Sequence, residues 1–189
     1  MIPMMIKVRA LLGSMALLAL AGGPVLADSN TVRTEIRDEL RGVSLYSIQI
    51  SEEPVNSLTV IEGSFADSDR IALGLSAAVY DGAGGTEEYV FWLRHEGRRW
   101  LTTELSDPVI IEADDVPIDM ELLRVPRPII GPDNRFFEKF EFRFRDPEIK
   151  QLLEGGQVVV SFRSTTGVVQ KTVSGQELES IRAFSDSLE

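Results

Sequence analysis

The amino-acid sequence predicts a mainly β protein: an antiparallel β-sandwich or a partly open barrel, with two or three short helices, one of them at the C-terminus. Apolar residues alternate strictly over residues 71–79 and again at Phe140, Phe142 and Phe144, which is the period of a strand with one buried face. Such segments follow one another without long helices between them, and this order favours antiparallel pairing over βαβ units.

The first 27 residues have the pattern of a cleavable signal peptide. Lys7 and Arg9 precede an apolar run over residues 10–21, which is followed by helix-breaking residues and by Ala27 at the expected cleavage site. The run is much shorter than the roughly 20 residues of a membrane-spanning helix, which disfavours an uncleaved anchor. We therefore predict a bacterial protein exported to the periplasm or beyond, with residues 28–189 forming a single soluble β-rich domain.

The composition of this domain limits its partners. The chain contains no cysteine, so neither a disulfide nor a lipid at the cleavage site is available. Loss of Lys7 and Arg9 leaves 17 basic against 30 acidic residues, a formal charge of −13. A field of this sign repels nucleic acid and anionic lipid headgroups. We expect no nucleic-acid partner, and no transmembrane segment in the mature chain.

The N-terminal half of the domain predicts one helix and then several strands. Val32, Ile36 and Leu40 recur at helical spacing and predict a short amphipathic helix that Gly42 ends. Residues 43–50 predict a strand, with a bulge at residues 45–46 where the apolar phase slips. Further strands are expected over residues 58–65, 71–79, 87–95 and 100–105, with turns at residues 81–86 and 96–97.

The C-terminal half predicts shorter strands, a proline-rich loop and two helices. Strands over residues 109–113 and 118–125 flank an acidic turn, and three prolines at 126, 128 and 132 stiffen the loop before the Phe140 strand. Asp146 is expected to cap a short helix that Gly155 ends. After a hairpin over residues 157–173, Ser174 and Glu177 have the spacing of a capping box. They open a last helix whose apolar face carries Leu178, Ile181, Phe184 and Leu188.

The C-terminal part of the chain resembles a group of known proteins. This part resembles small exported bacterial β-sandwich domains of unknown function. The resemblance is carried by the short helix, the strand that ends in Arg163, the glycine hairpin, the segment 178–184, and Arg99-Trp100-Leu101. The last hairpin and helix are also similar to those of invasion-associated locus B proteins, whose paired cysteines this chain lacks. The resemblance implies a fold class and a compartment, and it implies no activity.

An acidic cluster offers the one metal-site candidate in the sequence. Asp114 and Asp115 lie in a predicted turn, where their oxygens can converge on Ca²⁺. The spacing is not that of an EF-hand, and the acids around the turn, Glu112, Asp119 and Glu121, fit the solvent-facing side of two strands. We therefore predict no metal and no cofactor, with Asp114 and Asp115 as weak candidates.

No residue pattern specifies a reaction. His95, the single histidine, is expected at the surface near a hairpin turn, and no Gly-x-Ser-x-Gly elbow frames a serine for a catalytic triad. The glycine-rich segment 82–85 leads into a strand, whereas a phosphate-binding loop leads into a helix. No catalytic residue is assigned.

A possible interaction patch combines Trp92 with nearby arginines. Trp92 alternates with the apolar face of its strand, so it is either buried from both sides or presented to a partner. Tryptophan and arginine are common in binding hot spots, and the patch consists of Trp92, Arg94, Arg98 and Arg99. The three arginines belong to a larger set of basic residues that includes Lys139, Arg143, Arg145 and Arg163. One alternative is that this set binds an acidic glycan or a carboxylate-rich partner. The other is that it pairs with Glu87, Glu88, Glu138 and Glu141.

These observations favour an exported, non-enzymatic domain that binds an unknown protein, glycan or small ligand. One alternative is a hydrolase or metal-dependent enzyme that uses the acidic turn. Another is a lipocalin-like carrier, which requires the sheet to close around a cavity.

Overall fold

The computed structural model describes residues 33–38, 42–80, 86–101, 107–123 and 129–188. Over these residues the chain forms two antiparallel sheets that do not close into a barrel, in agreement with a β-sandwich. The large sheet has the strand order β1 (Arg33–Asp38), β2 (Val43–Pro54), β4 (Arg70–Tyr80), β5 (Thr86–Gly97), β10 (Phe136–Phe144) and β8 (Glu121–Leu122), with β9 (Ile129–Ile130) also paired to β10. The small sheet has the order β3 (Thr59–Gly63), β12 (Gly167–Val173), β11 (Val158–Ser164), β6 (Val109–Ala113) and β7 (Val116–Pro117).

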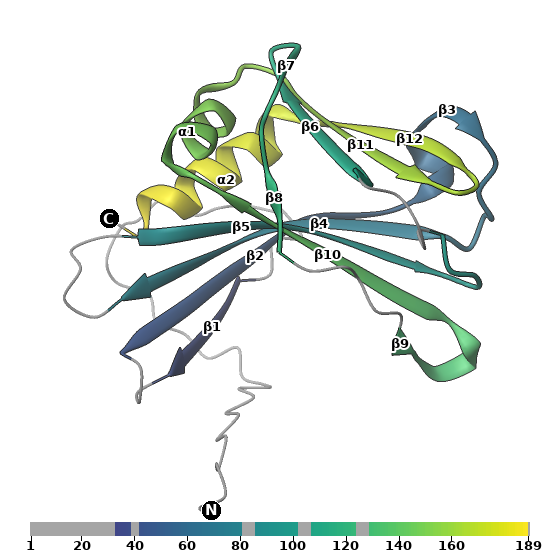
Figure 1. Ribbon diagram of the computed structural model, residues 1–189, viewed down its shortest axis with the longest axis horizontal. Coiled ribbons are helices and arrows are strands. Elements are labelled where there is room, and N and C mark those ends of the chain that lie inside the picture. Colours follow the sequence, from purple (N-terminus) through teal and green to yellow (C-terminus); the bar gives the residue numbers. More distant parts are fainter. Residues whose placement is uncertain (1–32, 39–41, 81–85, 102–106, 124–128, 189) are drawn as a thin grey trace, which may run out of the picture.

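One face of the large sheet is covered by the small sheet and by both helices, α1 (Asp146–Glu154) and α2 (Gly175–Asp186) (Figure 1). A single core of buried apolar residues lies between these layers. Phe140 of the large sheet meets Phe162 of the small sheet edge to face, with ring centroids 5.8 Å apart.

Several sequence predictions are confirmed. Residues 71, 73, 75 and 77 are buried on the core side of β4, and Phe140, Phe142 and Phe144 are buried on β10. Strands β11 and β12 form the predicted hairpin, and β6 has the predicted bounds. Ser174 accepts a hydrogen bond from the Glu177 N–H while the Glu177 carboxylate accepts one from the Ser174 N–H. The capping box therefore opens α2, whose Leu178, Ile181 and Phe184 are buried.

The predicted N-terminal helix is wrong over its described residues, because residues 33–38 form strand β1. Its register with β2 runs from Arg33 opposite Ile48 to Asp38 opposite Val43. A short amphipathic stripe gives little helix stability by itself, and pairing with β2 supplies backbone hydrogen bonds instead. Gly42, with a φ of 61°, lies in the left-handed region between the two strands, so it does not end a helix.

The predicted bulge in β2 lies elsewhere. The register between β2 and β4 shifts between Gln49 and Ser51, several residues beyond the predicted position. The apolar phase slips at residues 45–46 because the strand has apolar residues on both faces. Leu45 lies on the outer face and Tyr46 packs against the core.

Further element boundaries differ from the predictions. Over the described part of the predicted strand 118–125, only β8 at Glu121–Leu122 is a strand. Gly97 belongs to β5, and the second neighbour of β5 is β10 rather than a strand at residues 100–105. Trp100 and Leu101 are not in a strand, and residues 102–106 lie outside the described residues. Arg145 is the N-cap of α1, so Asp146 is the first helical residue and makes no capping hydrogen bond.

Some predictions concern parts of the chain that are not described. The signal peptide, Pro126 and Pro128 lie outside the described residues. Where the structure does describe the chain, it contains no helix with the length and hydrophobicity to cross a membrane.

Candidate functional site

His95 is buried, with 0% of its side chain exposed, so its predicted surface position is wrong. Its Nδ1 lies 2.9 Å from Oε2 of Glu138, which is its register partner on β10. Its Nε2 lies 4.0 Å from Oδ1 of Asp69, and Asp69 and Glu138 are themselves fully buried. We call these three residues the His95 cluster.

The His95 cluster ties separate segments of the chain together. Glu138 also accepts a hydrogen bond from the Leu101 N–H at 3.2 Å, and Asp69 accepts one from the Ala66 N–H at 2.9 Å. Gly97 makes room for the cluster, because a Cβ at this position would lie 2.4 Å from Asp69 Oδ1. Nε2 of His95 faces the carboxylate of Asp69. A nucleophilic triad requires a hydroxyl at that position.

The sequence contains one signal for this cluster, which is the alternation of buried residues along β10. Glu138 falls on the same alternating face as Phe140, Phe142 and Phe144, so the period of β10 places a carboxylate in the core. A buried carboxylate needs a hydrogen-bonding partner. That His95 is this partner depends on the register between β5 and β10.

The acidic turn connects β6 to β7. Asp114 and Asp115 both have positive φ, 51° and 63°. The Asp114 carboxylate accepts hydrogen bonds from the N–H groups of Gly156 and Gln157, at distances between 2.9 and 3.1 Å. The bond from Gly156, and then that from Gln157, lowers the pKa of Asp114. Its carboxylate oxygens therefore hold the turn against the start of β11. Among the described residues, no three His, Asp or Glu side chains are arranged so that they could hold a metal ion.

Trp92 lies on the outer face of the large sheet and is 8% exposed. Its indole rests on Gly74 of the neighbouring strand, where a Cβ would come within 2.0 Å of the ring. Its Nε1–H donates to Ser47 Oγ at 3.2 Å, and Lys139 Nζ lies 5.4 Å from the ring centroid. Trp92 is thus covered on the outer face and does not belong to the core between the sheets.

The arginines of the predicted patch do not gather around Trp92. Arg94 lies on the same face and pairs with Glu52 at 3.1 Å. Arg98 and Arg99 are exposed beyond the end of β5, and Arg99 donates to the Ser64 carbonyl at 3.2 Å. Because a strand rises about 3.3 Å per residue, Arg98 lies roughly 20 Å from Trp92 along the chain.

Ion pairs account for other basic residues, within β10 for Lys139 and across strands for Arg143. Lys139 pairs with Glu141 at 2.8 Å, and Arg143 pairs with Glu88 at 2.9 Å and with Glu121 at 3.5 Å. The hydrogen bond to Glu88 is the main cause that raises the pKa of Arg143. The side chain of Glu87 lies outside the described residues.

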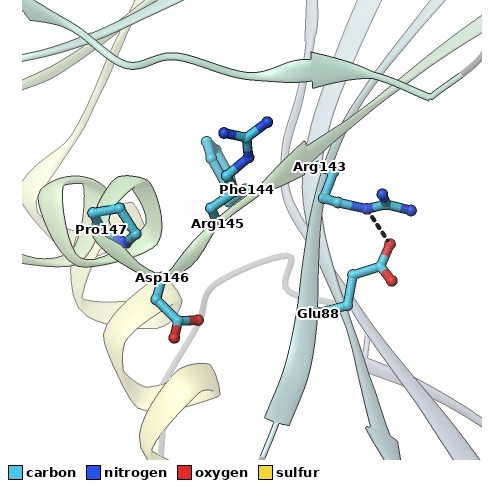
Figure 2. A pocket seen from close by; sticks show the side chains of 6 residues that line it. All are labelled: Glu88, Arg143, Phe144, Arg145, Asp146 and Pro147. Atoms are coloured by element: carbon cyan, nitrogen blue, oxygen red, sulfur yellow. Dashed lines mark hydrogen bonds and ion pairs between the residues drawn. The ribbon is translucent and has the colours of Figure 1, made fainter.

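The last residues of β10 and the first turn of α1 border two hollows that share Arg143 and Arg145. The larger, about 540 Å³ and open to solvent, is lined by Glu88, Arg143, Phe144, Arg145, Asp146 and Pro147. The smaller, about 70 Å³, is lined by Asp119, Met120, Glu121, Arg143, Arg145 and Glu148. We call the two hollows together the α1 groove. Figure 2 shows Arg143 turned toward Glu88, Arg145 pointing in another direction, and Asp146 and Pro147 on α1.

Two groups in the α1 groove lack partners. Among the described residues, the exposed guanidinium of Arg145 makes no hydrogen bond or ion pair. Oε2 of Glu148 is buried and has no hydrogen-bond partner. The groove thus offers the exposed guanidinium of Arg145 to a ligand, and it lies next to a buried carboxylate oxygen that has no partner.

Comparison of the chain with protein-family models, with curated proteins and with solved structures found no significant match.

Proposed function

We propose that the protein is an exported, non-enzymatic binding domain. Its ligand in this proposal carries a carboxylate next to hydroxyl or amine donors, as an acidic glycan or an acidic peptide does, and it binds in the α1 groove. The observation that carries the proposal is Arg145, an exposed guanidinium without a partner among the described residues, at the border of both hollows.

The chemistry of the groove supports this ligand class. A free guanidinium binds a carboxylate through two parallel hydrogen bonds, an arrangement that lysine does not provide. Oε2 of Glu148 is buried, so it would accept a hydrogen bond from a hydroxyl or amine of the same ligand only after its side chain turns toward solvent. The charge of Arg143 is neutralised by Glu88 and Glu121, so the direct contact to the ligand is assigned to Arg145.

The arrangement of the fold favours binding over the two alternatives. Asp114 and Asp115, the acidic turn on which the enzyme alternative depends, line neither hollow. The His95 cluster, which contains the single histidine, is buried and also lines neither hollow. The sheets do not form the closed barrel that a lipocalin-like carrier needs. Export rests on the signal-peptide pattern of residues 1–27.

Titration calorimetry with two acidic probes tests the proposal. Oligogalacturonate and a short poly-glutamate peptide each carry carboxylates, and only the sugar also carries a row of hydroxyl groups. We expect heat of binding with at least one of them, and none with a neutral oligosaccharide of equal length. Binding of the sugar alone would identify a glycan, and binding of the peptide alone would identify a protein partner.

Matched variants assign the binding to the groove. We expect Arg145→Gln to weaken binding of the active probe at least tenfold. Arg163→Gln, which removes an exposed arginine from strand β11 of the small sheet, should leave it unchanged. Absence of binding by both probes, or equal losses in the two variants, would contradict the proposal.

A further inference from the structure

The β1 edge of the large sheet has three features that belong together. Strand β1 pairs with β2 on one side and has no neighbour on the other side among the described residues (Figure 1). Its central residue Ile36 is 60% exposed on the outer face of the sheet. Leu45, directly opposite Ile36 on β2, is 46% exposed. An open edge next to exposed aliphatic side chains is a template for another strand.

The order of charges on β1 is complementary to itself. From Thr34 to Asp38 the strand reads Thr, Glu, Ile, Arg, Asp. When two copies pair antiparallel with Ile36 opposite Ile36, Glu35 of each copy faces Arg37 of the other, and Thr34 faces Asp38. Opposite charges at directly facing positions stabilise a strand pair, whereas like charges destabilise it.

Neighbouring registers lack this match. A shift of the pairing by two residues in one direction places Glu35 opposite Glu35, and the same shift in the other direction places Arg37 opposite Arg37. A shift by a single residue brings Ile36 opposite a charged residue, Glu35 or Arg37. The charges therefore select a single register, with a two-fold axis through the Ile36 pair.

We propose that two copies of this chain associate through β1, which joins their large sheets into one continuous antiparallel sheet. Such a two-fold interface presents the same surface from both subunits. The outer face at the junction then carries an aliphatic row in the order Leu45, Ile36, Ile36, Leu45, whose burial drives association. Backbone hydrogen bonds along the edge add affinity, as in other strand-addition interfaces. The exposed charge pairs add little energy and mainly set the register.

Sedimentation equilibrium over a range of concentrations tests the proposal, with the protein recovered after expression of the whole sequence. We expect a monomer–dimer equilibrium whose dissociation constant rises at least tenfold in Ile36→Lys. The matched control is Ile61→Lys, which places the same charge at an exposed isoleucine on β3, an edge strand of the small sheet. It should leave the equilibrium unchanged.

Charge reversal then tests the register itself. Glu35→Arg and Arg37→Glu each place like charges opposite one another, so each variant alone should dimerise more weakly than the wild type. A mixture of the two restores both opposite pairs and should form a heterodimer, and the double variant should again form a homodimer. Thermal melts by circular dichroism check that each variant is folded.

Three results would overturn the proposal. One is a wild-type chain that stays monomeric at every concentration. The second is a dimer that Ile36→Lys leaves intact. The third is a mixture of the two charge variants in which native mass spectrometry finds no heterodimer.

Discussion

Single polar residues inside the core join segments that are far apart in the sequence. The carboxylate of Glu138 on β10 is hydrogen-bonded to both the imidazole of His95 and the N–H of Leu101. In an apolar environment each of these donors is costly without an acceptor, so the carboxylate fixes the position of the chain after β5. A steric reason explains the glycine at position 97, since a Cβ there would collide with Asp69.

Replacement of Glu138 should destabilise the protein strongly. Glu138→Ala leaves His95 and the Leu101 N–H without their acceptor, and each buried group left unpaired costs about 1–3 kcal/mol. We therefore expect a loss of at least ~2 kcal/mol in the free energy of unfolding, measured by urea titration. The control Glu121→Ala removes an exposed partner of Arg143 and should cost less than ~1 kcal/mol. Equal losses in both variants would show that the buried hydrogen bonds of Glu138 stabilise the protein no more than an exposed ion pair does.

Asp114 makes a contribution to stability that depends on pH. The amides of Gly156 and Gln157 lower its pKa in the folded protein below the ordinary value of 3.8. Its contribution is therefore fully present above the unfolded pKa and is lost as the pH falls through the lower folded pKa. We expect Asp114→Asn, which keeps an acceptor and tolerates the positive φ, to be less stable than the wild type at neutral pH. In urea titrations at decreasing pH the difference should disappear in acid, and a constant difference would contradict this account.

At the scale of elements, strict alternation was a reliable guide wherever one face of a strand was buried. Strands β4 and β10 follow their apolar period, and α2 follows its capping box. Strand β1 has no such alternation. A spacing of four residues between its apolar side chains fits a helix, so this exposed edge strand was not predicted. The apolar residues on both faces of β2 likewise imitated a bulge.

The packing of β10 against the small sheet predicts the effect of a core substitution. Phe140 is buried against Phe162, so Phe140→Ala removes the aromatic contact between the two sheets. The expected cost is about 3–5 kcal/mol, which combines the lost burial with the cavity that remains. Phe137→Ala on the same strand changes a half-buried ring of the outer face, and it should cost clearly less in the same urea titration. A larger loss at position 137 would mean that the face assignment of β10 is wrong.

At the scale of the whole molecule, one core joins both sheets and both helices. A shared core predicts that the layers unfold together in a two-state transition. Tryptophan fluorescence reports on Trp92 of the large sheet and on Trp100 just after β5, and far-ultraviolet circular dichroism reports on all strands and helices. The two probes should give the same urea midpoint. Separate midpoints would show that the small sheet or the helices unfold independently.

The sequence by itself determined the elements whose signals are local. Periodicity defined the Phe140 strand, the Ser174–Glu177 spacing defined the start of α2, and the two turn aspartates defined the β6–β7 turn. Tertiary structure decided which strands are neighbours, because register depends on contacts between residues distant in the chain. The burial of His95 against Glu138 and Asp69 follows from that register, as does the open edge at β1. The approach of Glu88 and Glu121 to Arg143 follows from the pairing of β10 with β5 and β8.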